Sequence, residues 1–401
     1  MITLDGLRAA PNALAPHYSR FRVAERLLLT GHSHQAWPDV AREGQLEAFD
    51  DAAEAVDDKW ERAGAKAEDV RAGFRRLLED PAGEVALAAS THELVVRLLS
   101  GLDLRSRRRL VTTDGEFHSL RRQLARLAEE GVEVVRVPAT PEDTLTERLA
   151  AAVDDRTAAV MVSAVLFETA RIVPHLGDLA PACRARGVEL VVDAYHALGA
   201  VPLPIHELGL GSAWVVGGGY KYLQLGEGNA FLRVPPHGAE LRPVFTGWFA
   251  EFDARADAVA SGGVGYGPDA QRWAGATYDP TSNYRAARVF RFFADEGLTP
   301  ALLRRSYQHQ LAVLAGAFDA LDAPDAVVTR DRATPLEAFG GFLALRSPRA
   351  GELCAELARR GVATDSRGDI LRVGPAPYLS DDQLTGAMAA LGEVTRLRSA
   401  V

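Results

Sequence analysis

From about residue 84, short apolar runs alternate with amphipathic segments along the chain. The runs are LVTT, VEVVRVP, TAAVMVSAVLF and VELVVDA, and between them lie SLRRQLARLAEEG, DTLTERLAAAV and LAPACRARG. The second set places apolar residues at helical spacing. The stretches AAVMVSAVLF and VELVV lack polar alternation, which is typical of strands buried on both faces. The pattern predicts an α/β fold whose mostly parallel sheet is covered by helices.

The pattern changes after about residue 285. Two longer helical segments, YRAARVFRFFADEG and ALLRRSYQHQLAVLAGAFDAL, precede the strand-like stretches GGFLALRS and DILRVGP, which flank the helix GELCAELARRG. These elements indicate a smaller C-terminal α+β domain. We therefore expect an N-terminal arm and helix over residues 1–60, a large domain over 61–285 and a small domain over 286–401.

Composition and charge narrow the class of protein. The 401 residues are 47% hydrophobic and 25% charged, with a net charge of −9, which argues against nucleic acid or an anionic membrane surface as the main partner. No apolar stretch approaches the roughly 18 residues of a membrane span, and the N-terminus lacks the pattern of a signal peptide. The two cysteines, Cys183 and Cys354, support neither a disulfide framework nor a cysteine-based zinc site. We expect a cytoplasmic enzyme.

Candidate chemistry follows two of the predicted strands. VELVVDAYHALG places Asp193 at a strand end with His196 three residues later, and SAWVVGGGYKY places Lys221 after the next strand. Ligands of open parallel sheets bind beyond the carboxyl ends of the strands. A lysine amine with a lowered pKa attacks aldehydes, and an aspartate can hold the proton of a pyridine nitrogen, as in enzymes that use pyridoxal phosphate. Spacing alone leaves open that Asp193 is a helix cap and Lys221 a solvated loop residue.

Four segments in order carry a family resemblance. The chain has DAYH at 193–196, YKYL at 220–223, TGW at 246–248 and DILRVGPAPY at 369–378. Together they resemble the class V aminotransferase superfamily of pyridoxal phosphate enzymes, and among them the kynureninases. The resemblance covers nearly the whole chain and implies fold type I, with a large cofactor-binding domain and a smaller C-terminal one.

The resemblance also implies the cofactor site. It makes Lys221 the residue that forms a Schiff base with pyridoxal phosphate and Asp193 the partner of the pyridine nitrogen, with His196 close behind. It further assigns to the cofactor Ser90, Thr91, His92, Phe117, Tyr220, Trp248 and Thr277. In this scheme residues 90–92 form the turn before a helix whose N–H groups hold the phosphate. Phe117 stacks on the pyridine ring, and Tyr220 reaches the phosphate.

Other residues concern the partner subunit and the substrate. The counterparts of Trp248 and Thr277 reach the phosphate of a cofactor held by the neighbouring subunit, which implies a homodimer with composite active sites. Arg372 matches the arginine that binds the α-carboxylate of an amino acid substrate, a task suited to a planar guanidinium.

The chain departs from kynureninases where the aromatic end of the substrate would lie. Leu120 stands in place of an aspartate, the segment GWFAEF lacks a histidine, and GHSHQAWP adds His32 and His34. An H-x-H pair could hold a metal, but no second cluster completes such a site. We favour a polar active-site loop with His32 near the substrate, and expect no metal.

Three classes of function remain. A kynureninase-like hydrolase would cleave the Cβ–Cγ bond of kynurenine or a related aryl-keto amino acid, whereas an aminotransferase of the same superfamily would share every cofactor residue. A non-catalytic module is disfavoured because the retained lysine, aspartate and arginine form a chemical apparatus. A cysteine desulfurase is also disfavoured, since the loop near ATPLEAFGG has no cysteine and Phe167 stands where desulfurases have an asparagine.

Overall fold

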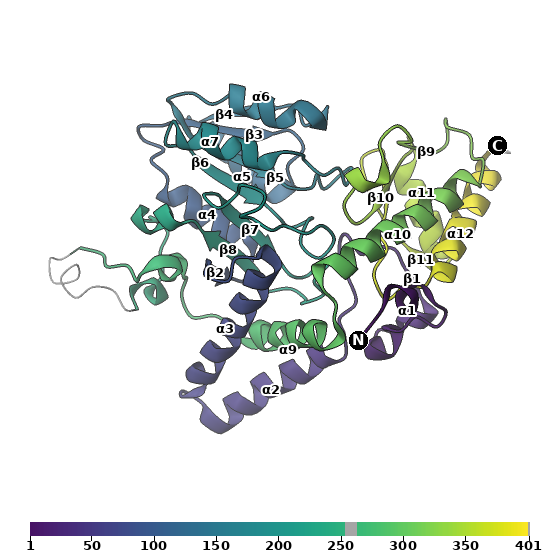
Figure 1. Cartoon of the computed structure of the whole chain (residues 1–401), viewed down its shortest axis with the longest axis horizontal. Coiled ribbons are helices and arrows are strands. Elements are labelled where there is room, and N and C mark those ends of the chain that lie inside the picture. The colour runs from purple at the N-terminus through teal and green to yellow at the C-terminus, as the bar shows by residue number, and fades with distance from the viewer. Residues whose placement is uncertain (253–262, 400–401) are drawn as a thin grey trace.

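Two lobes of unequal size make up the protein (Figure 1). The computed structural model describes residues 1–252 and 263–399. The larger lobe is built on a seven-stranded sheet and the smaller one on a four-stranded sheet. One large core cluster of buried apolar residues extends through both lobes.

The large sheet is mixed rather than purely parallel. Its strand order is β2-β8-β7-β6-β5-β3-β4, and only β8 runs antiparallel to both of its neighbours. The strands are β2 (Glu84–Ala88), β3 (Arg109–Thr113), β4 (Glu133–Val137), β5 (Thr157–Ser163), β6 (Glu189–Asp193), β7 (Trp214–Gly218) and β8 (Ala230–Val234). Since β2 and β7 both run antiparallel to β8, they point in the same direction. The carboxyl end of β2 therefore lies at the same edge as the carboxyl ends of the parallel strands.

The α/β fold predicted from the sequence is confirmed. All seven residues of β5 are buried, as its unbroken apolar run predicted, and β6 is buried at its three central positions. The connecting helices of the large lobe are α4 (Thr91–Gly101), α5 (His118–Glu129), α6 (Leu145–Ala151) and α7 (Leu179–Arg184). They sit on the sheet through apolar residues at helical spacing, for example Leu94 and Leu98 of α4.

The small lobe packs three helices on an antiparallel sheet of order β12-β13-β10-β9. Its strands are β9 (Thr329–Arg330), β10 (Leu343–Arg346), β12 (Asp365–Arg367) and β13 (Ile370–Val373), and its helices are α10 (Pro300–Asp319), α11 (Ala350–Arg359) and α12 (Asp381–Ser399). The hairpin of β12 and β13 places Asp365 directly opposite Arg372.

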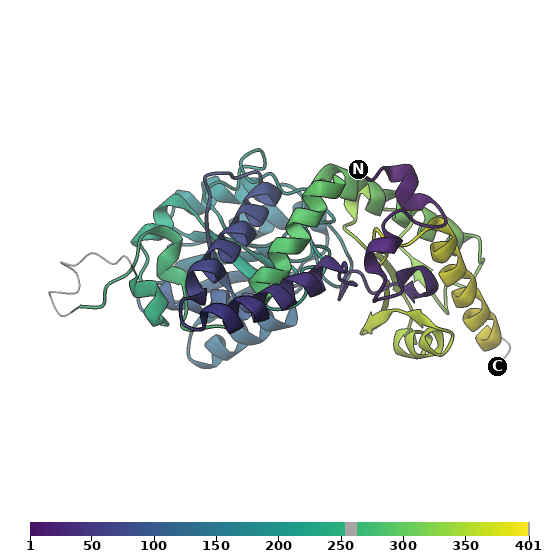
Figure 2. The same cartoon turned by 90° about the horizontal axis from the view of Figure 1, so that it is seen from below.

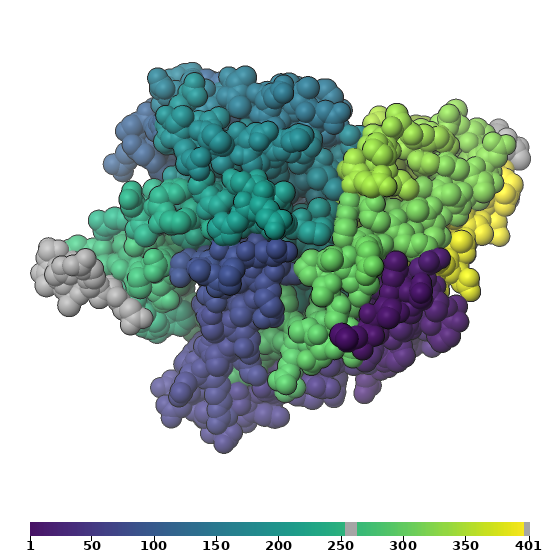
Figure 3. All heavy atoms as spheres, in the orientation of Figure 1, coloured from purple at the N-terminus to yellow at the C-terminus, as the bar shows by residue number. Residues whose placement is uncertain are grey.

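The N-terminal arm is part of the small lobe in space. After α1 (Leu4–Arg8), strand β1 (Leu27–Leu28) pairs with β11 (Val362–Ala363). Figure 3 shows this purple segment lying against the green and yellow residues of the C-terminal part. The arm and the small lobe therefore form one structural unit, although they lie at opposite ends of the sequence.

Three helices connect the lobes. Helices α2 (Val40–Ala55) and α3 (Lys59–Leu78) pack against α9 (Thr281–Glu296), which leads into the small lobe (Figure 2). The α2–α9 contact needs a glycine, because a Cβ on Gly44 would lie 2.6 Å from the carbonyl oxygen of Tyr284. The division of the chain at residues 60 and 285 stays a prediction. Among the helices in the described ranges, none is long and apolar enough to cross a membrane.

Candidate active site

A cavity of about 270 Å³ opens at the carboxyl edge of the large sheet. It is lined by eight of the residues that the sequence assigned to a cofactor: Ser90, Thr91, His92, Phe117, Asp193, His196, Tyr220 and Lys221. They come from the ends of β2, β3, β6 and β7 or from the segments that follow them. The fold thus brings together residues that are up to 131 positions apart in the sequence, as the interval from Ser90 to Lys221 shows.

Lys221 lies at the centre of this cavity. Its side chain is buried, and its Nζ lies 2.6 Å from Nε2 of His196. Three aromatic rings surround the amine, with centroids 5.0 Å away for Phe117, 4.8 Å for Tyr195 and 5.7 Å for Tyr220. The amine therefore has one polar partner and an otherwise aromatic environment.

Burial sets the charge states of the groups around Lys221. It lowers the pKa of the Lys221 amine to about 7, against the opposing attraction of Asp193. The same loss of solvent holds the pKa of His196 well below its usual range, so its neutral ring accepts a hydrogen bond from Lys221 at Nε2. Burial raises the pKa of Asp193, although the backbone N–H of Tyr195 donates to its Oδ1 at 2.8 Å. Near neutral pH, a substantial fraction of the Lys221 amine is therefore unprotonated and can act as a nucleophile.

Glycines allow the loop after β7 to carry Lys221 into the cavity. A Cβ on Gly218 would lie 2.6 Å from Oη of Tyr195, so only glycine lets the loop pass this ring. The loop closes through two backbone hydrogen bonds, from Leu225 N to the carbonyl of Gly219 and from Gly219 N to the carbonyl of Asn229. The run of glycines that flanks Lys221 in the sequence is thus a packing requirement.

One wall of the cavity is the N-terminus of α4. Ser90 caps the helix, since its Oγ accepts a hydrogen bond from Glu93 N at 3.3 Å. The first N–H groups of a helix have no partner within the helix and carry a partial positive charge. Thr91 and His92, which begin the helix, line the cavity and form a site suited to a phosphate group.

A buried carboxyl group, Glu116, lies beneath the cavity and was not singled out in the sequence. Its oxygens accept hydrogen bonds from Thr113 Oγ1 at 2.7 Å, Ser163 Oγ at 2.6 Å and Ser163 N at 3.2 Å. Ser163 is in turn the partner of Asp193 in the register of β5 and β6. Burial raises the pKa of Glu116 to about 7. Nothing in the sequence TTDGEF distinguishes this glutamate from a surface residue.

The predicted substrate residues Arg372 and His32 do not line the cavity. Arg372 donates from Nε to Oδ1 of Asp365 at 2.7 Å and from Nη2 to Oδ2, and His32 Nε2 lies 2.8 Å from the same Oδ1. Both side chains are almost completely buried. Asp365, which the sequence analysis did not consider, is the residue that joins them. The substrate roles of Arg372 and His32 stay predictions.

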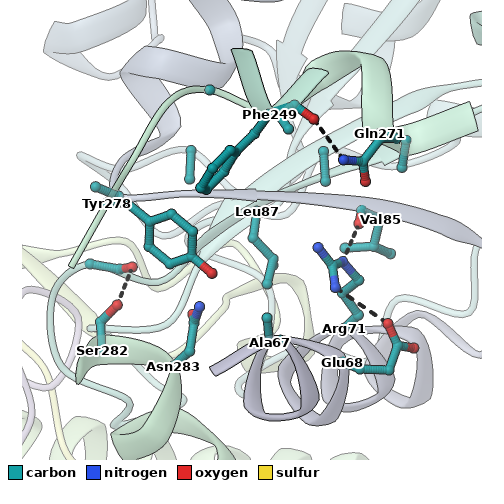
Figure 4. A pocket seen from close by; sticks show the side chains of 18 of the residues that line it. Ala67, Glu68, Arg71, Val85, Leu87, Phe249, Gln271, Tyr278, Ser282 and Asn283 are labelled. Atoms are coloured by element: carbon teal, nitrogen blue, oxygen red, sulfur yellow. Dashed lines mark hydrogen bonds and ion pairs between the residues drawn. The ribbon is translucent and has the colours of Figure 1, made fainter. Parts of the chain in front are cut away.

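Trp248 and Thr277 line a second, larger cavity of about 1330 Å³. Nε1 of Trp248 donates to Oγ1 of Thr277 at 3.3 Å. Figure 4 shows Phe249 and Tyr278 pointing into this cavity above Leu87. The two cavities share three lining residues: Ala89, Glu227 and Gly228. The structure therefore places Trp248 and Thr277 beside the site of Lys221 rather than inside it.

The histidines of GHSHQAWP separate in the structure. His32 faces Asp365, whereas the ring of His34 stacks on Tyr220 with centroids 4.9 Å apart and its Nε2 lies 3.6 Å from Glu227. Across residues 1–252 and 263–399, no group of three histidine, cysteine, aspartate or glutamate side chains is placed to hold a metal ion.

Apolar side chains complete the lining of the cavity. Phe167 packs edge-on against Phe117 with centroids 5.4 Å apart, and Leu120 and Val165 also line this side. Neither cysteine lines the cavity: Cys183 is buried in the core of the large lobe, and Cys354 contacts Thr364 in the small lobe. The wall offers apolar contact and no thiol.

Known sequences share similarity with much of this chain. The sequence profile of the class-V aminotransferases matches residues 45–217. The chain is 24% identical over 340 residues to an uncharacterized aminotransferase, YcbU, of Bacillus subtilis, covering 84% of this chain and 86% of that protein. It is 27% identical over 364 residues to isopenicillin N epimerase of Streptomyces clavuligerus, covering 86% and 88%.

Solved structures share the fold. C-DES, in a mutant with glycine covalently linked to the PLP cofactor, superimposes with a TM-score of 0.83 at 15% identity, over 94% of this chain and 98% of that chain. The apo cysteine desulfurase of Thermococcus onnurineus NA1 gives 0.80 at 18% identity, over 96% and 98%. The chain has the α/β fold of the class V enzymes, fold type I, which confirms the expected fold class.

The buried carboxyl group of Glu116 generates a stability prediction. Its pKa of about 7 in the folded protein exceeds its ordinary 4.5, so its stabilising effect is complete below pH 4.5 and is lost as pH rises to about 7. The change Glu116→Gln keeps the shape and a donor toward Ser163 but cannot ionise. At pH 8 we expect this variant to be more stable than wild type by on the order of 1–3 kcal/mol.

The measurement is urea unfolding of both proteins at several values between pH 4.5 and 8. The exposed Glu207 provides the control, since Glu207→Gln should follow the wild-type curve throughout. A stability difference between Glu116→Gln and wild type that does not change with pH would show that Glu116 keeps one charge state over this range.

Proposed function

We propose that this protein is a pyridoxal phosphate enzyme that acts on an α-amino acid. One observation carries the proposal: a buried lysine, an aspartate, aromatic rings and a helix N-terminus meet in a single cavity of about 270 Å³. These groups supply the four attachments that the cofactor needs, for its aldehyde, its ring nitrogen, its ring face and its phosphate. The chain shares its fold with C-DES, whose structure contains a PLP cofactor, and this similarity supports the same conclusion.

The polar atoms of the cavity leave donors free for pyridoxal phosphate. Nδ1 of His196 is buried without a hydrogen-bond partner, and the Lys221 amine bonds only the other nitrogen of that ring. Asp193 would hold the pyridine nitrogen, Phe117 the ring face, and Ser90 with Thr91 the phosphate. When bound, pyridoxal phosphate supplies an aldehyde for the substrate amine and a ring that takes up electrons released at Cα.

The chain's own residues then perform two tasks. The first belongs to Lys221, whose amine has a pKa of about 7 and can attack an aldehyde in its unprotonated form near neutral pH. The second is proton transfer at the substrate Cα, for which a displaced Lys221 amine is the nearest base. His196 keeps Nζ in place through its Nε2, and the negative charge of Asp193 favours a protonated ring nitrogen.

The substrate we propose is an aryl-keto amino acid such as kynurenine. What supports it is the apolar wall of Phe167, Leu120 and Val165, which suits an aromatic side chain, together with the resemblance to kynureninases in DAYH and YKYL. In the hydrolysis, water adds to the γ-carbonyl carbon and the Cβ–Cγ bond breaks. The electron pair of that bond goes to Cβ, which takes a proton, so that alanine and an aryl carboxylic acid are formed.

An aminotransferase is the alternative. The match to the Bacillus subtilis protein described as an uncharacterized aminotransferase favours it, and it would use the same lysine and aspartate. A desulfurase that attacks sulfur with a cysteine is disfavoured, because neither Cys183 nor Cys354 lines the cavity.

A homodimer with composite sites is part of the proposal. Support comes from the second cavity, whose rim exposes aromatic residues that a monomer would leave in water: Trp248 is 53% exposed, Phe252 46% and Tyr278 39%. Exposed apolar patches of this kind mark interaction surfaces. Because this cavity adjoins the Lys221 site, a second copy bound there would bring its own residues close to the cofactor.

The first prediction from the proposed function concerns the lysine that binds the cofactor. Protein mixed with pyridoxal phosphate should turn yellow, and borohydride should fix the cofactor's mass on the peptide that contains Lys221. The chain has only two other lysines, Lys59 and Lys66, so peptide mapping is unambiguous. Lys221→Ala should abolish the labelling, whereas the control Lys59→Arg should keep it. Labelling of Lys66 or of no lysine would refute the proposal.

The second prediction separates the two activities. Cofactor-loaded protein should convert kynurenine or 3-hydroxykynurenine to alanine and an aryl carboxylic acid without a 2-oxo acid, as chromatography with mass detection would show. Lys221→Ala should form neither product. If product appears only when a 2-oxo acid is added and is then a new amino acid, the protein is an aminotransferase.

The third prediction concerns the composite site. Sedimentation should give about twice the 43.1 kDa of one chain. Mixing two variants of low activity, Lys221→Ala and Trp248→Ala, should restore part of the activity after subunit exchange, because one site of each heterodimer contains both wild-type residues. A mixture that stays as inactive as its components after demonstrated exchange argues against a shared site.

A further inference from the structure

Three side chains from three parts of the chain meet behind Phe167. His32 comes from the N-terminal arm, Asp365 from β12 and Arg372 from β13. The Arg372 guanidinium lies between the rings of Phe167 and Phe342, with centroids 6.0 and 5.6 Å from its Cζ. Since Phe167 lines the Lys221 cavity, this cluster lies directly behind one of the cavity's apolar side chains.

The hydrogen bonds of Arg372 are only partly used within the protein. A guanidinium has five N–H bonds, of which three are accounted for: Nε and Nη2 donate to Asp365, and Nη1 donates to the carbonyl of Phe167 at 2.7 Å. One N–H on each terminal nitrogen is left. Two N–H groups of one guanidinium can together bind a second carboxylate.

Asp365 is itself fixed from behind. Burial raises the pKa of its carboxyl group, but hydrogen bonds from His32 and Arg372 outweigh this effect and hold the pKa below its usual range. Burial lowers the pKa of His32 to about 4, so the ring is neutral and donates from Nε2 to Asp365. The other nitrogen of the His32 ring packs against the backbone, because a Cβ on Gly374 would lie 2.1 Å from Nδ1. The cluster is therefore rigid and carries no net charge.

We propose that Asp365, supported by His32, is a positioning residue that holds Arg372 in the plane in which its free N–H bonds bind the substrate carboxylate. The inference rests on the proposed function, since it takes the ligand to be an α-amino acid. It assigns His32 a place behind the carboxylate site rather than in contact with the substrate. A neutral cluster attracts an anion through the direction of its donors, so the position of Arg372 decides the affinity.

The test compares two ligands that differ in the carboxylate, L-phenylalanine and 2-phenylethylamine. The cofactor's absorbance reports binding of each to the loaded protein, and the ratio of the two Kd values measures carboxylate preference. We expect wild type to prefer the amino acid by at least about tenfold. Asp365→Asn removes the charge and turns an amide N–H toward Arg372, and it should lower the ratio about tenfold.

A matched control lies in the same hairpin. Asp369 is half exposed and pairs with Arg346 at 3.2 Å, so Asp369→Asn should keep the wild-type ratio. His32→Phe removes the donor to Asp365 but keeps a ring beside Phe342, and should lower the ratio about threefold. The second variant keeps the test informative if Asp365→Asn folds poorly.

The outcomes separate the inference from the function beneath it. If wild type binds the cofactor at Lys221 but Asp365→Asn keeps or increases the ratio, Asp365 is a counter-ion or a competitor and the inference is wrong. A wild type that binds the cofactor without preferring the amino acid overturns the inference as well. Failure to bind the cofactor at Lys221 would instead overturn the proposed function.

Discussion

Removal of the Lys221 amine from water is the constraint on which the site depends. A lysine in solvent stays protonated at neutral pH, whereas burial among Phe117, Tyr195 and Tyr220 lowers its pKa to about 7. Two other features of the site allow the amine to be buried. Glycines carry the loop past the ring of Tyr195, and the neutral ring of His196 supplies the one hydrogen bond that the amine makes.

Two carboxyl groups of the large lobe, Asp193 and Glu116, lie near this lysine. Asp193 lies at the end of β6 and lines the cavity, while Glu116 does not line it and accepts hydrogen bonds from Thr113 and Ser163. Two carboxyl groups so close together and so little solvated cannot both ionise without cost. Burial raises the pKa of both carboxyl groups, and Asp193 is the one of the two that lines the cavity and faces the ligand.

The small lobe places a cluster of side chains behind Phe167, and its members come from distant parts of the chain. The arm that carries His32 pairs with β11, and β12 with β13 sets Asp365 against Arg372. This cluster and the Lys221 loop come from different lobes, so any change in the angle between the lobes would alter the distance from Arg372 to Lys221. Helices α2, α3 and α9, packed together between the lobes, limit such a change.

The sequence by itself determined the α/β fold and the central strands, because local apolar periodicity is a property of neighbouring residues. Its family resemblance also pointed to eight residues that line the cavity, whereas His32, Trp248, Thr277 and Arg372, which it assigned as well, lie outside that cavity. It did not reveal the reversed strand β8, the attachment of the arm to the small lobe, or the parts played by Glu116 and Asp365. These depend on contacts between distant segments. Glu116 and Ser163 are 47 residues apart in the sequence, and Asp365 and His32 are 333 residues apart. Only tertiary structure decides which carboxyl groups lose their solvent, and burial, rather than residue type, sets their charge and role.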